Sequence, residues 1–142
     1  MIKQISIFLE NKAGRLAAVT KTLGQANINI RALSIADTTE FGILRLIVDR
    51  PDDAYQVLKD AGYSVTETDV LAIEVPDVPG GLAQVLEVMG KAEINVEYLY
   101  GFLARATDDA IIIFRVESPE AASILLSQHG FTLLSGATVY SL

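Results

Sequence analysis

The chain repeats itself, and this internal repeat constrains its fold more than any other feature of the sequence. When residues 14–33 are laid over residues 80–99, an offset of 66, nine of the twenty positions are identical. Composition alone would give roughly one or two identities. The identical pairs are Gly14/Gly80, Leu16/Leu82, Ala17/Ala83, Val19/Val85, Gly24/Gly90, Ala26/Ala92, Ile28/Ile94, Asn29/Asn95 and Leu33/Leu99.

The repeat continues beyond this window at an offset of 68. Its matched pairs there are Pro51/Pro119, Ala54/Ala122, Leu58/Leu126, Gly62/Gly130 and Tyr63/Phe131. The two extra residues of the second copy therefore lie between Leu99 and Ile111. Because the chain has 142 residues, each copy has about 70 and is marginally stable by itself. We expect one domain at residues 1–69 and a second at residues 70–142.

Each copy predicts the order strand, helix, strand, strand, helix, strand. Apolar residues recur at helical spacing, and runs rich in β-branched residues predict the strands. The predicted strands are 2–9, 28–36, 41–49 and 64–68 in the first copy, and 70–75, 94–103, 110–117 and 131–134 in the second. The predicted helix positions facing the core are Leu16, Val19, Leu23 and Ala26, matched by Leu82, Val85, Met89 and Ala92.

Particular residues mark the turns. A change of alternation between Ile30 and Leu33 predicts a β-bulge, and residues 38–40 (Thr-Thr-Glu) predict a hairpin turn. Pro51 and Pro119 are expected at the first position of the later helices, where the missing N–H does no harm. Ser118 is a candidate N-cap, and Gly62 is expected to end its helix.

This element order predicts an α+β fold: a ferredoxin-like βαββαβ unit in two tandem copies, each an antiparallel sheet with two helices on one face. The third strands should turn Leu44, Leu46 and Val48, matched by Ile112, Phe114 and Val116, toward the helices. The opposite face carries Ile43, Arg45 and Ile47, matched by Ile111, Ile113 and Arg115. Either these strands are merely apolar, or the other copy or another chain covers this face.

Composition excludes several classes of function. Without cysteine the chain has no disulfide framework, zinc ribbon or thiol nucleophile. The one histidine, His129, aligns with Ala61, so no duplicated catalytic or metal centre follows, and we expect no cofactor and no metal. A net charge of −7 opposes nucleic acid and anionic membrane as partners. The strands also lack the stacking aromatics of RNA-recognition motifs. No signal peptide or spanning helix is evident, so we expect a cytoplasmic protein.

The loop before the first helix of each copy is the first candidate site. It has the sequence Glu-Asn-Lys-Ala-Gly-Arg-Leu at residues 10–16 and Pro-Asp-Val-Pro-Gly-Gly-Leu at residues 76–82. One interpretation is local: Asn11 and Asp77 cap the helix, and the glycine permits the turn. The other is functional, because free N–H groups and the positive end of a helix dipole can hold a carboxylate.

Two asparagines form the second candidate site. Asn29 and Asn95 occupy the same place at the start of the second strand in both copies, although strands disfavour asparagine. Their amides either satisfy local backbone or contact a small polar ligand. An amide both donates and accepts hydrogen bonds, so it can meet the ammonium or the carboxylate of an amino acid.

These residues together resemble an ACT domain, over the whole chain and in two tandem copies. The resemblance rests on Asp77-Val78-Pro79-Gly80 and Ile94-Asn95-Val96 in a βαββαβ unit; the first copy departs from the loop motif with Asn11-Lys12-Ala13-Gly14. Residues 9–16 are also similar to the small regulatory subunit of acetolactate synthase and to the regulatory end of phosphoglycerate dehydrogenase. Leu9 and Val75 cannot offer the polar side chain that the family sometimes places before the loop.

The resemblance implies a regulatory module that binds an amino acid between two ACT copies. The ligand-binding residues it implies are Asn11, Ala13, Gly14, Arg15, Leu16, Asn29, Ile30, Asp77, Pro79, Gly80, Gly81, Leu82, Asn95 and Val96. Because Arg15 and Gly81 differ, the two sites need not be equivalent. We therefore expect a non-catalytic amino-acid sensor, a homodimer that signals to an enzyme of amino-acid metabolism. The alternative is an interaction subunit of an acetolactate-synthase-like enzyme, without its own ligand; an enzyme in its own right is the third reading.

Overall fold

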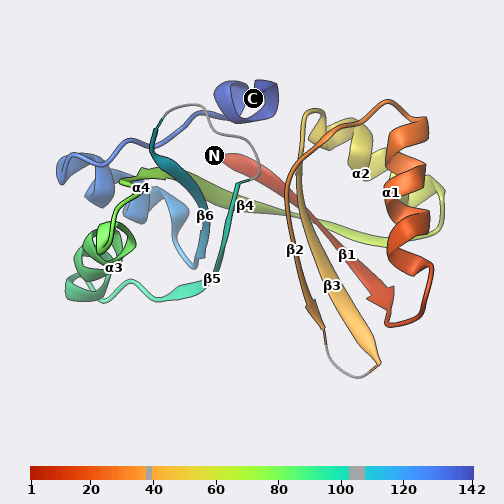
Figure 1. Cartoon of the computed structure of the whole chain (residues 1–142), viewed down its shortest axis with the longest axis horizontal. Helices are drawn as coiled ribbons and strands as arrows, with labels where there is room; N and C mark the ends of the chain where they lie inside the picture. The colour runs from red at the N-terminus through yellow and green to blue at the C-terminus, as the bar shows by residue number, and fades with distance from the viewer. Residues whose placement is uncertain (38–39, 103–107) are drawn as a thin grey trace. The chain divides into compact units, whose positions relative to one another are not determined.

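The computed structural model describes residues 1–37, 40–102 and 108–142 (Figure 1). The chain divides into two compact units, one formed by Lys3–Thr68 and the other by Asp69–Leu142 with Met1–Ile2. The predicted hairpin turn at Thr38 and Thr39, and the end of the predicted strand at Leu103, lie outside the described residues.

The unit of residues 3–68 has the predicted element order. Its elements are β1 (Ile2–Glu10), α1 (Arg15–Gln25), β2 (Ile30–Asp37), β3 (Phe41–Val48), α2 (Pro51–Asp60) and the first part of β4 (Ser64–Val75). The strands lie in the order β2-β3-β1-β4. The β1–β3 and β2–β3 pairs are antiparallel, with Leu44 opposite both Ile7 and Ile35.

The unit of residues 69–142 repeats this arrangement. Its elements are the rest of β4, α3 (Gly81–Lys91), β5 (Val96–Gly101), β6 (Ala110–Val116), α4 (Pro119–Gln128) and α5 (Gly136–Ser141). The strand order is β4-β6-β5, again with antiparallel pairs. The α+β, ferredoxin-like βαββαβ prediction is therefore confirmed. None of the helices in the described residues is both long and apolar enough to cross a bilayer.

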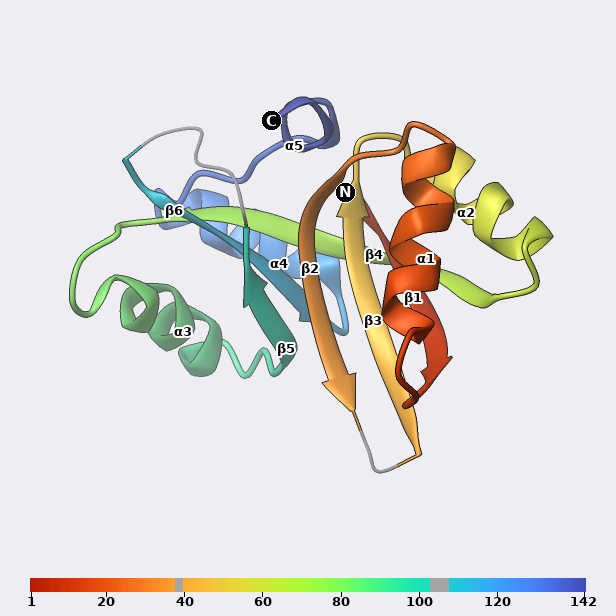
Figure 2. The same cartoon turned by 45° about the vertical axis from the view of Figure 1, so that its right-hand side comes forward.

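Each unit has its own core between sheet and helices. Figures 1 and 2 show α1 and α2 along one face of the first unit's strands. In the core of the first unit, Leu44, Leu46 and Val48 are fully buried with Val19 and Leu23 of α1. In the core of the second unit, Phe114 and Val116 are buried with Val85 and Met89 of α3. The predicted parity of the third strands is correct, because alternate strand residues point to one face. Ile47 and Ile113, of the opposite parity, are buried too.

The second strands begin two residues later than predicted, because a backbone motif ends the preceding helices. After α1, Asn27 has a positive φ of 59° and donates to the Gly24 carbonyl at 3.0 Å, and Ile28 donates to the Leu23 carbonyl at 3.0 Å. This is a Schellman motif. Glu93 and Ile94 repeat it after α3, at 3.0 and 2.9 Å. The chain must complete this turn before it can extend.

The predicted bulge is present in both copies. The register shifts between Ile30 and Ala32 in β2, and between Val96 and Tyr98 in β5. Pro51 and Pro119 open α2 and α4 as predicted. Ser118 precedes α4 as expected, but its side chain makes no capping hydrogen bond.

The ends of the copies differ from the prediction. The last strand of the first copy and the first strand of the second are one strand, β4. The strand predicted at 131–134 is reduced to a bridge between Ile73 and Leu133. Beyond it lies the unpredicted α5, whose N-cap Ser135 accepts a hydrogen bond from the Thr138 N–H at 3.2 Å.

Two glycine-to-alanine changes test these backbone assignments. Gly24 lies within α1, where an added Cβ meets nothing within 4 Å, whereas Gly62 has a φ of 91° after α2. Gly24→Ala should raise the free energy of unfolding by about 0.5–1 kcal/mol, and Gly62→Ala should lower it by about 1–2 kcal/mol. Urea denaturation of both variants measures the difference. Equal effects of the same sign would contradict the assigned helix end.

Candidate functional site

The loop between the first strand and first helix forms the same tight turn in both copies. In the first, the Arg15 N–H donates to the Lys12 carbonyl at 3.3 Å, and Gly14 has φ 86° and ψ −13°. In the second, the Gly81 N–H donates to the Val78 carbonyl at 3.0 Å, and Gly80 has φ 83° and ψ −4°. These angles are those of the third residue of a type II turn, a position that favours glycine.

This turn explains why Ala or Pro directly precedes Gly in the two loops. Pro79 is the second residue of its turn, where its fixed φ is favourable, and Ala13 takes the same place. The helices begin directly after Gly14 and Gly80, and no side chain caps either one. The interpretation of Asn11 and Asp77 as N-caps is therefore wrong, because the glycines occupy the N-cap position. The N–H groups of Arg15 and Gly81, the first residues of the helices, are used in closing the turns. The donors left to a ligand are those of the next helical residues, beginning with Leu16 and Leu82.

The first copy surrounds its turn with charge. Lys12 lies 3.0 Å and Arg15 3.8 Å from carboxylate oxygens of Glu10. The hydrogen bond and charge of Lys12, followed by the charge of Arg15, hold the pKa of Glu10 below its usual range. A hollow of about 140 Å³ lies here, lined by Leu9, Glu10, Asn11, Lys12, Arg15, Leu16, Ile35 and Gly42.

The second copy has a glycine, Gly81, at the position of Arg15. Gly81 is buried, and a Cβ added to it would lie 2.0 Å from the Pro76 carbonyl oxygen. Arg15 has no such restriction and is exposed. The two loops therefore share a backbone and differ at this position: an exposed guanidinium at Arg15 in the first copy, and a buried glycine at Gly81 in the second.

The two asparagines lie at the other end of each sheet. Asn29 directly precedes β2; its backbone N–H donates to Oδ1 of Asp49 at 3.0 Å, and its carbonyl accepts from the Asp49 N–H at 3.1 Å. Both asparagine side chains are exposed, and neither makes a hydrogen bond within the described ranges 1–37, 40–102 and 108–142. The amides are therefore available to a ligand.

Antiparallel register separates the asparagines from the loops of their own unit. The loop end of β1 pairs Glu10 with Phe41, whereas the Asn29 end of β2 pairs Ile30 with Val48. The eight residues of β2 span about 25 Å. In the second unit, Val75 before the loop pairs with Ala110, and Val96 after Asn95 pairs with Val116. No single unit brings both groups of predicted residues to one ligand.

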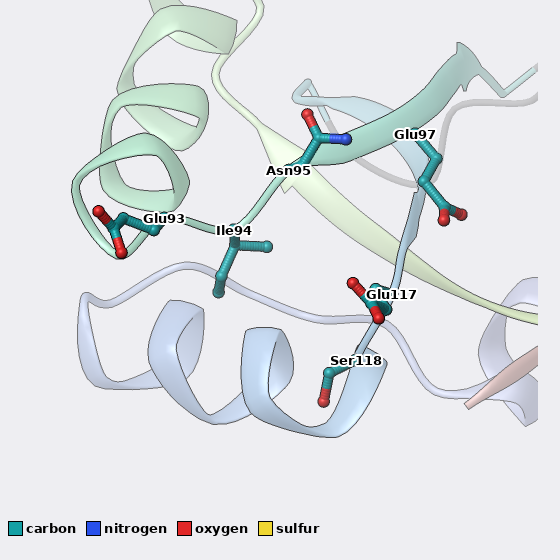
Figure 3. A pocket seen from close by; sticks show the side chains of 6 residues that line it. All are labelled: Glu93, Ile94, Asn95, Glu97, Glu117 and Ser118. Atoms are coloured by element: carbon teal, nitrogen blue, oxygen red, sulfur yellow. The ribbon is translucent and has the colours of Figure 1, made fainter.

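A larger pocket of about 460 Å³ surrounds Asn95 in the second unit (Figure 3). It is lined by Glu93, Ile94, Asn95, Glu97, Glu117 and Ser118, from the end of α3, the start of β5 and the segment between β6 and α4. The sequence prediction named only Asn95 among them. Comparison of the two copies at positions 93, 97, 117 and 118 was the signal that could have found the others.

The one histidine, His129, lies at the end of a helix. His129 is the C-cap of α4, and its ring nitrogen Nδ1 lies 2.9 Å from the Leu125 carbonyl oxygen. No group of three or more His, Cys, Asp or Glu side chains in the described part of the chain is arranged to hold a metal.

A model of the ACT domain pair family matches residues 1–135. The chain belongs to this family. The predicted ACT resemblance is thereby confirmed at the level of the family, and the paired domains of that description agree with the internal repeat. The further likeness to the small regulatory subunit of acetolactate synthase stays a prediction.

Solved structures share the ACT pair fold over nearly the whole chain. A protein of Bacteroides thetaiotaomicron is 42% identical, with a TM-score of 0.92 over 99% of this chain and 96% of its own. The ligand-free regulatory subunit of aspartate kinase from Thermus thermophilus is 17% identical, with a TM-score of 0.65 over 89% of this chain and 91% of its own. The Thermus flavus counterpart is 16% identical, with a TM-score of 0.60 over 89% and 90%. No curated protein sequence matches.

The two glycines of the second loop should differ in their tolerance of alanine. Gly81→Ala forces its Cβ against the Pro76 carbonyl and should lower the free energy of unfolding by about 2–3 kcal/mol. Gly80→Ala meets nothing within 4 Å and bears only the strain of its positive φ, about 1–2 kcal/mol. Chemical denaturation of both variants measures this order. A harmless Gly81→Ala would contradict the close approach of the loop.

Proposed function

We propose that this protein is a non-catalytic regulatory module that binds a small amino acid at interfaces between ACT domains and signals the bound state to a partner. Each ACT domain is one of the two repeated copies, residues 1–69 and 70–142. The family match supports a regulatory ligand-binding module. The ligand, its site and the partner are our proposal.

The observation that carries the proposal is the separation of the two polar groups in each sheet. The loop offers helix N–H donors and a positive dipole end suited to a carboxylate. The asparagine offers a carbonyl oxygen suited to an ammonium. Since the two lie at opposite ends of their own sheet, a complete amino-acid site needs the loop of one ACT domain and the asparagine of another.

The residues proposed to contact the ligand take distinct roles. The backbone around Gly14 and Gly80 allows the ligand close to the helix starts, where Leu16 and Leu82 supply N–H groups. Asn29 and Asn95 supply amides. The remaining predicted residues shape the turn or flank the amide: Asn11, Ala13, Arg15, Ile30, Asp77, Pro79, Gly81 and Val96.

A site shared between domains explains how binding could be signalled. A ligand shifts only an equilibrium whose two states it binds differently. An amino acid held by two domains favours the state in which they are paired. We propose a homodimer as the assembly that pairs them, and an enzyme of amino-acid metabolism as the partner that responds.

Thermal-shift and calorimetric titration with the twenty amino acids tests the proposal. At least one should stabilise the protein at about millimolar concentration, which corresponds to about 4 kcal/mol of binding free energy. Asn29→Ala or Asn95→Ala should weaken that binding about tenfold or more, because each removes hydrogen bonds to a charged ligand. Gln128→Ala, which removes an exposed amide at the end of α4, is the matched control and should bind normally.

Two results would contradict the proposal. One is the absence of stabilisation by all twenty amino acids. The other is binding that survives unchanged in both asparagine variants. Co-purification of a large catalytic chain with no response to any amino acid would support the alternative, an interaction subunit without its own ligand.

A further inference from the structure

The two copies differ most in chemistry at the pocket around Asn95. In the second unit this pocket is lined by three acidic residues, Glu93, Glu97 and Glu117 (Figure 3). Glu97 pairs with Arg115 at 3.1 Å. Neither Glu93 nor Glu117 has a side-chain hydrogen bond or ion pair within the described residues. Two acidic residues that line the pocket, Glu93 and Glu117, therefore have no partner cation within the described residues.

The first copy holds a cation at the matching place. The Arg50 guanidinium donates through Nη2 to the carbonyl oxygens of Ala26 and Asn27, each at 2.9 Å. Through Nη1 it donates to a carboxylate oxygen of Asp53 at 3.0 Å. The guanidinium thus joins the C-terminal end of α1, where the helix dipole is negative, to the start of α2.

The second copy keeps the backbone of this arrangement and lacks the cation. By the offsets of the repeat, Ala26 and Asn27 correspond to Ala92 and Glu93, which end α3 in the same Schellman motif. Arg50 corresponds to Ser118, and Asp53 corresponds to Ala121. A serine side chain is too short to reach the helix end, and the space is the pocket.

Three acidic residues line this space, and the Arg115 guanidinium pairs with one of them, Glu97. Asn27 and Arg31 of the first copy are replaced by Glu93 and Glu97, and Asp49 by Glu117. Residues 70–142 hold three basic and nine acidic residues, a net charge of −6, whereas residues 1–69 hold eight and nine, a net charge of −1. Relative to the first copy, the second lacks the Arg50 guanidinium and carries two further carboxylates, Glu93 and Glu97, at the same place.

We infer that the pocket of the second ACT domain binds a small organic cation carrying a guanidinium group, which takes the position that the Arg50 side chain takes in the first. The Ala92 and Glu93 carbonyls and the Glu117 carboxylate accept its N–H donors, which guanidinium supplies in a planar fork. A volume of about 460 Å³ suits a ligand of this size. The inference deepens the proposed function and rests on it in part, because Asn95 belongs to both sites.

Agmatine is the probe that separates this inference from the proposed function, since it carries a guanidinium and no carboxylate. Isothermal titration of the whole protein with agmatine should give saturable binding with a Kd of about 1 mM or lower. Arginine should bind and citrulline, its neutral isostere, should bind about tenfold more weakly or not at all. Added salt should weaken the binding of agmatine.

A variant that restores the first copy's side chains gives the sharpest control. Ser118→Arg combined with Ala121→Asp should fill the pocket and abolish agmatine binding, while the protein keeps its fold because the first copy already accommodates this pair. Glu117→Gln should weaken agmatine about tenfold. Glu87→Gln removes one exposed carboxylate from α3, outside the pocket lining, and should bind normally.

Several outcomes would overturn the inference: no saturable binding of agmatine at about 10 mM, equal binding of arginine and citrulline, or undiminished binding by the Ser118→Arg/Ala121→Asp variant. Binding of a neutral amino acid without agmatine would leave the proposed function standing and this inference refuted. Binding of agmatine and arginine, unchanged in both asparagine variants and without binding of any other amino acid, would do the reverse.

Discussion

The direction of the strands is the constraint on which the candidate site depends. In an antiparallel βαββαβ unit, the chain leaves β1 at one end of the sheet and enters β2 at the other, so the loop after β1 and the residue before β2 lie far apart. The pairing of Glu10 with Phe41, and of Ile30 with Val48, fixes this separation in the first copy. Under the proposed function, the loop and the asparagine that contact one ligand therefore come from two domains. A ligand between them would couple binding to domain pairing.

The two copies share their backbone geometry and differ in their side chains. Both copies place glycine at a positive φ before the first helix, end that helix in a Schellman motif and bulge in the second strand. Each of these is a backbone requirement that the sequence meets locally. Arg15 against Gly81, and Arg50 against Ser118, are side-chain differences on that common backbone. The two copies can thus have one fold and present different surfaces to a ligand.

Residues that act on their neighbours in the sequence predicted the fold, whereas the pocket depends on residues far apart in the sequence. Pro51, Gly62 and the parity change near Ile30 each act on their neighbours, so their turns, helix ends and bulge could be predicted. The late start of β2 could not, because no glycine marks the left-handed residue at Asn27. The pocket at Ser118 was missed because it depends on a side chain that is absent, and only comparison with Arg50 makes that absence visible. The predicted roles of the loop and asparagine residues stay predictions.

The central claim is that one ligand contacts the helix-start loop and the strand-start asparagine together. Two-dimensional NMR during titration with the amino acid that most stabilises the protein tests it directly. We expect a loop amide, of Leu16 or Leu82, and an asparagine side-chain amide, of Asn29 or Asn95, to shift with the same binding constant. Shifts confined to the loops, or confined to the asparagines, would contradict it, since a single end of each sheet would then hold the whole ligand.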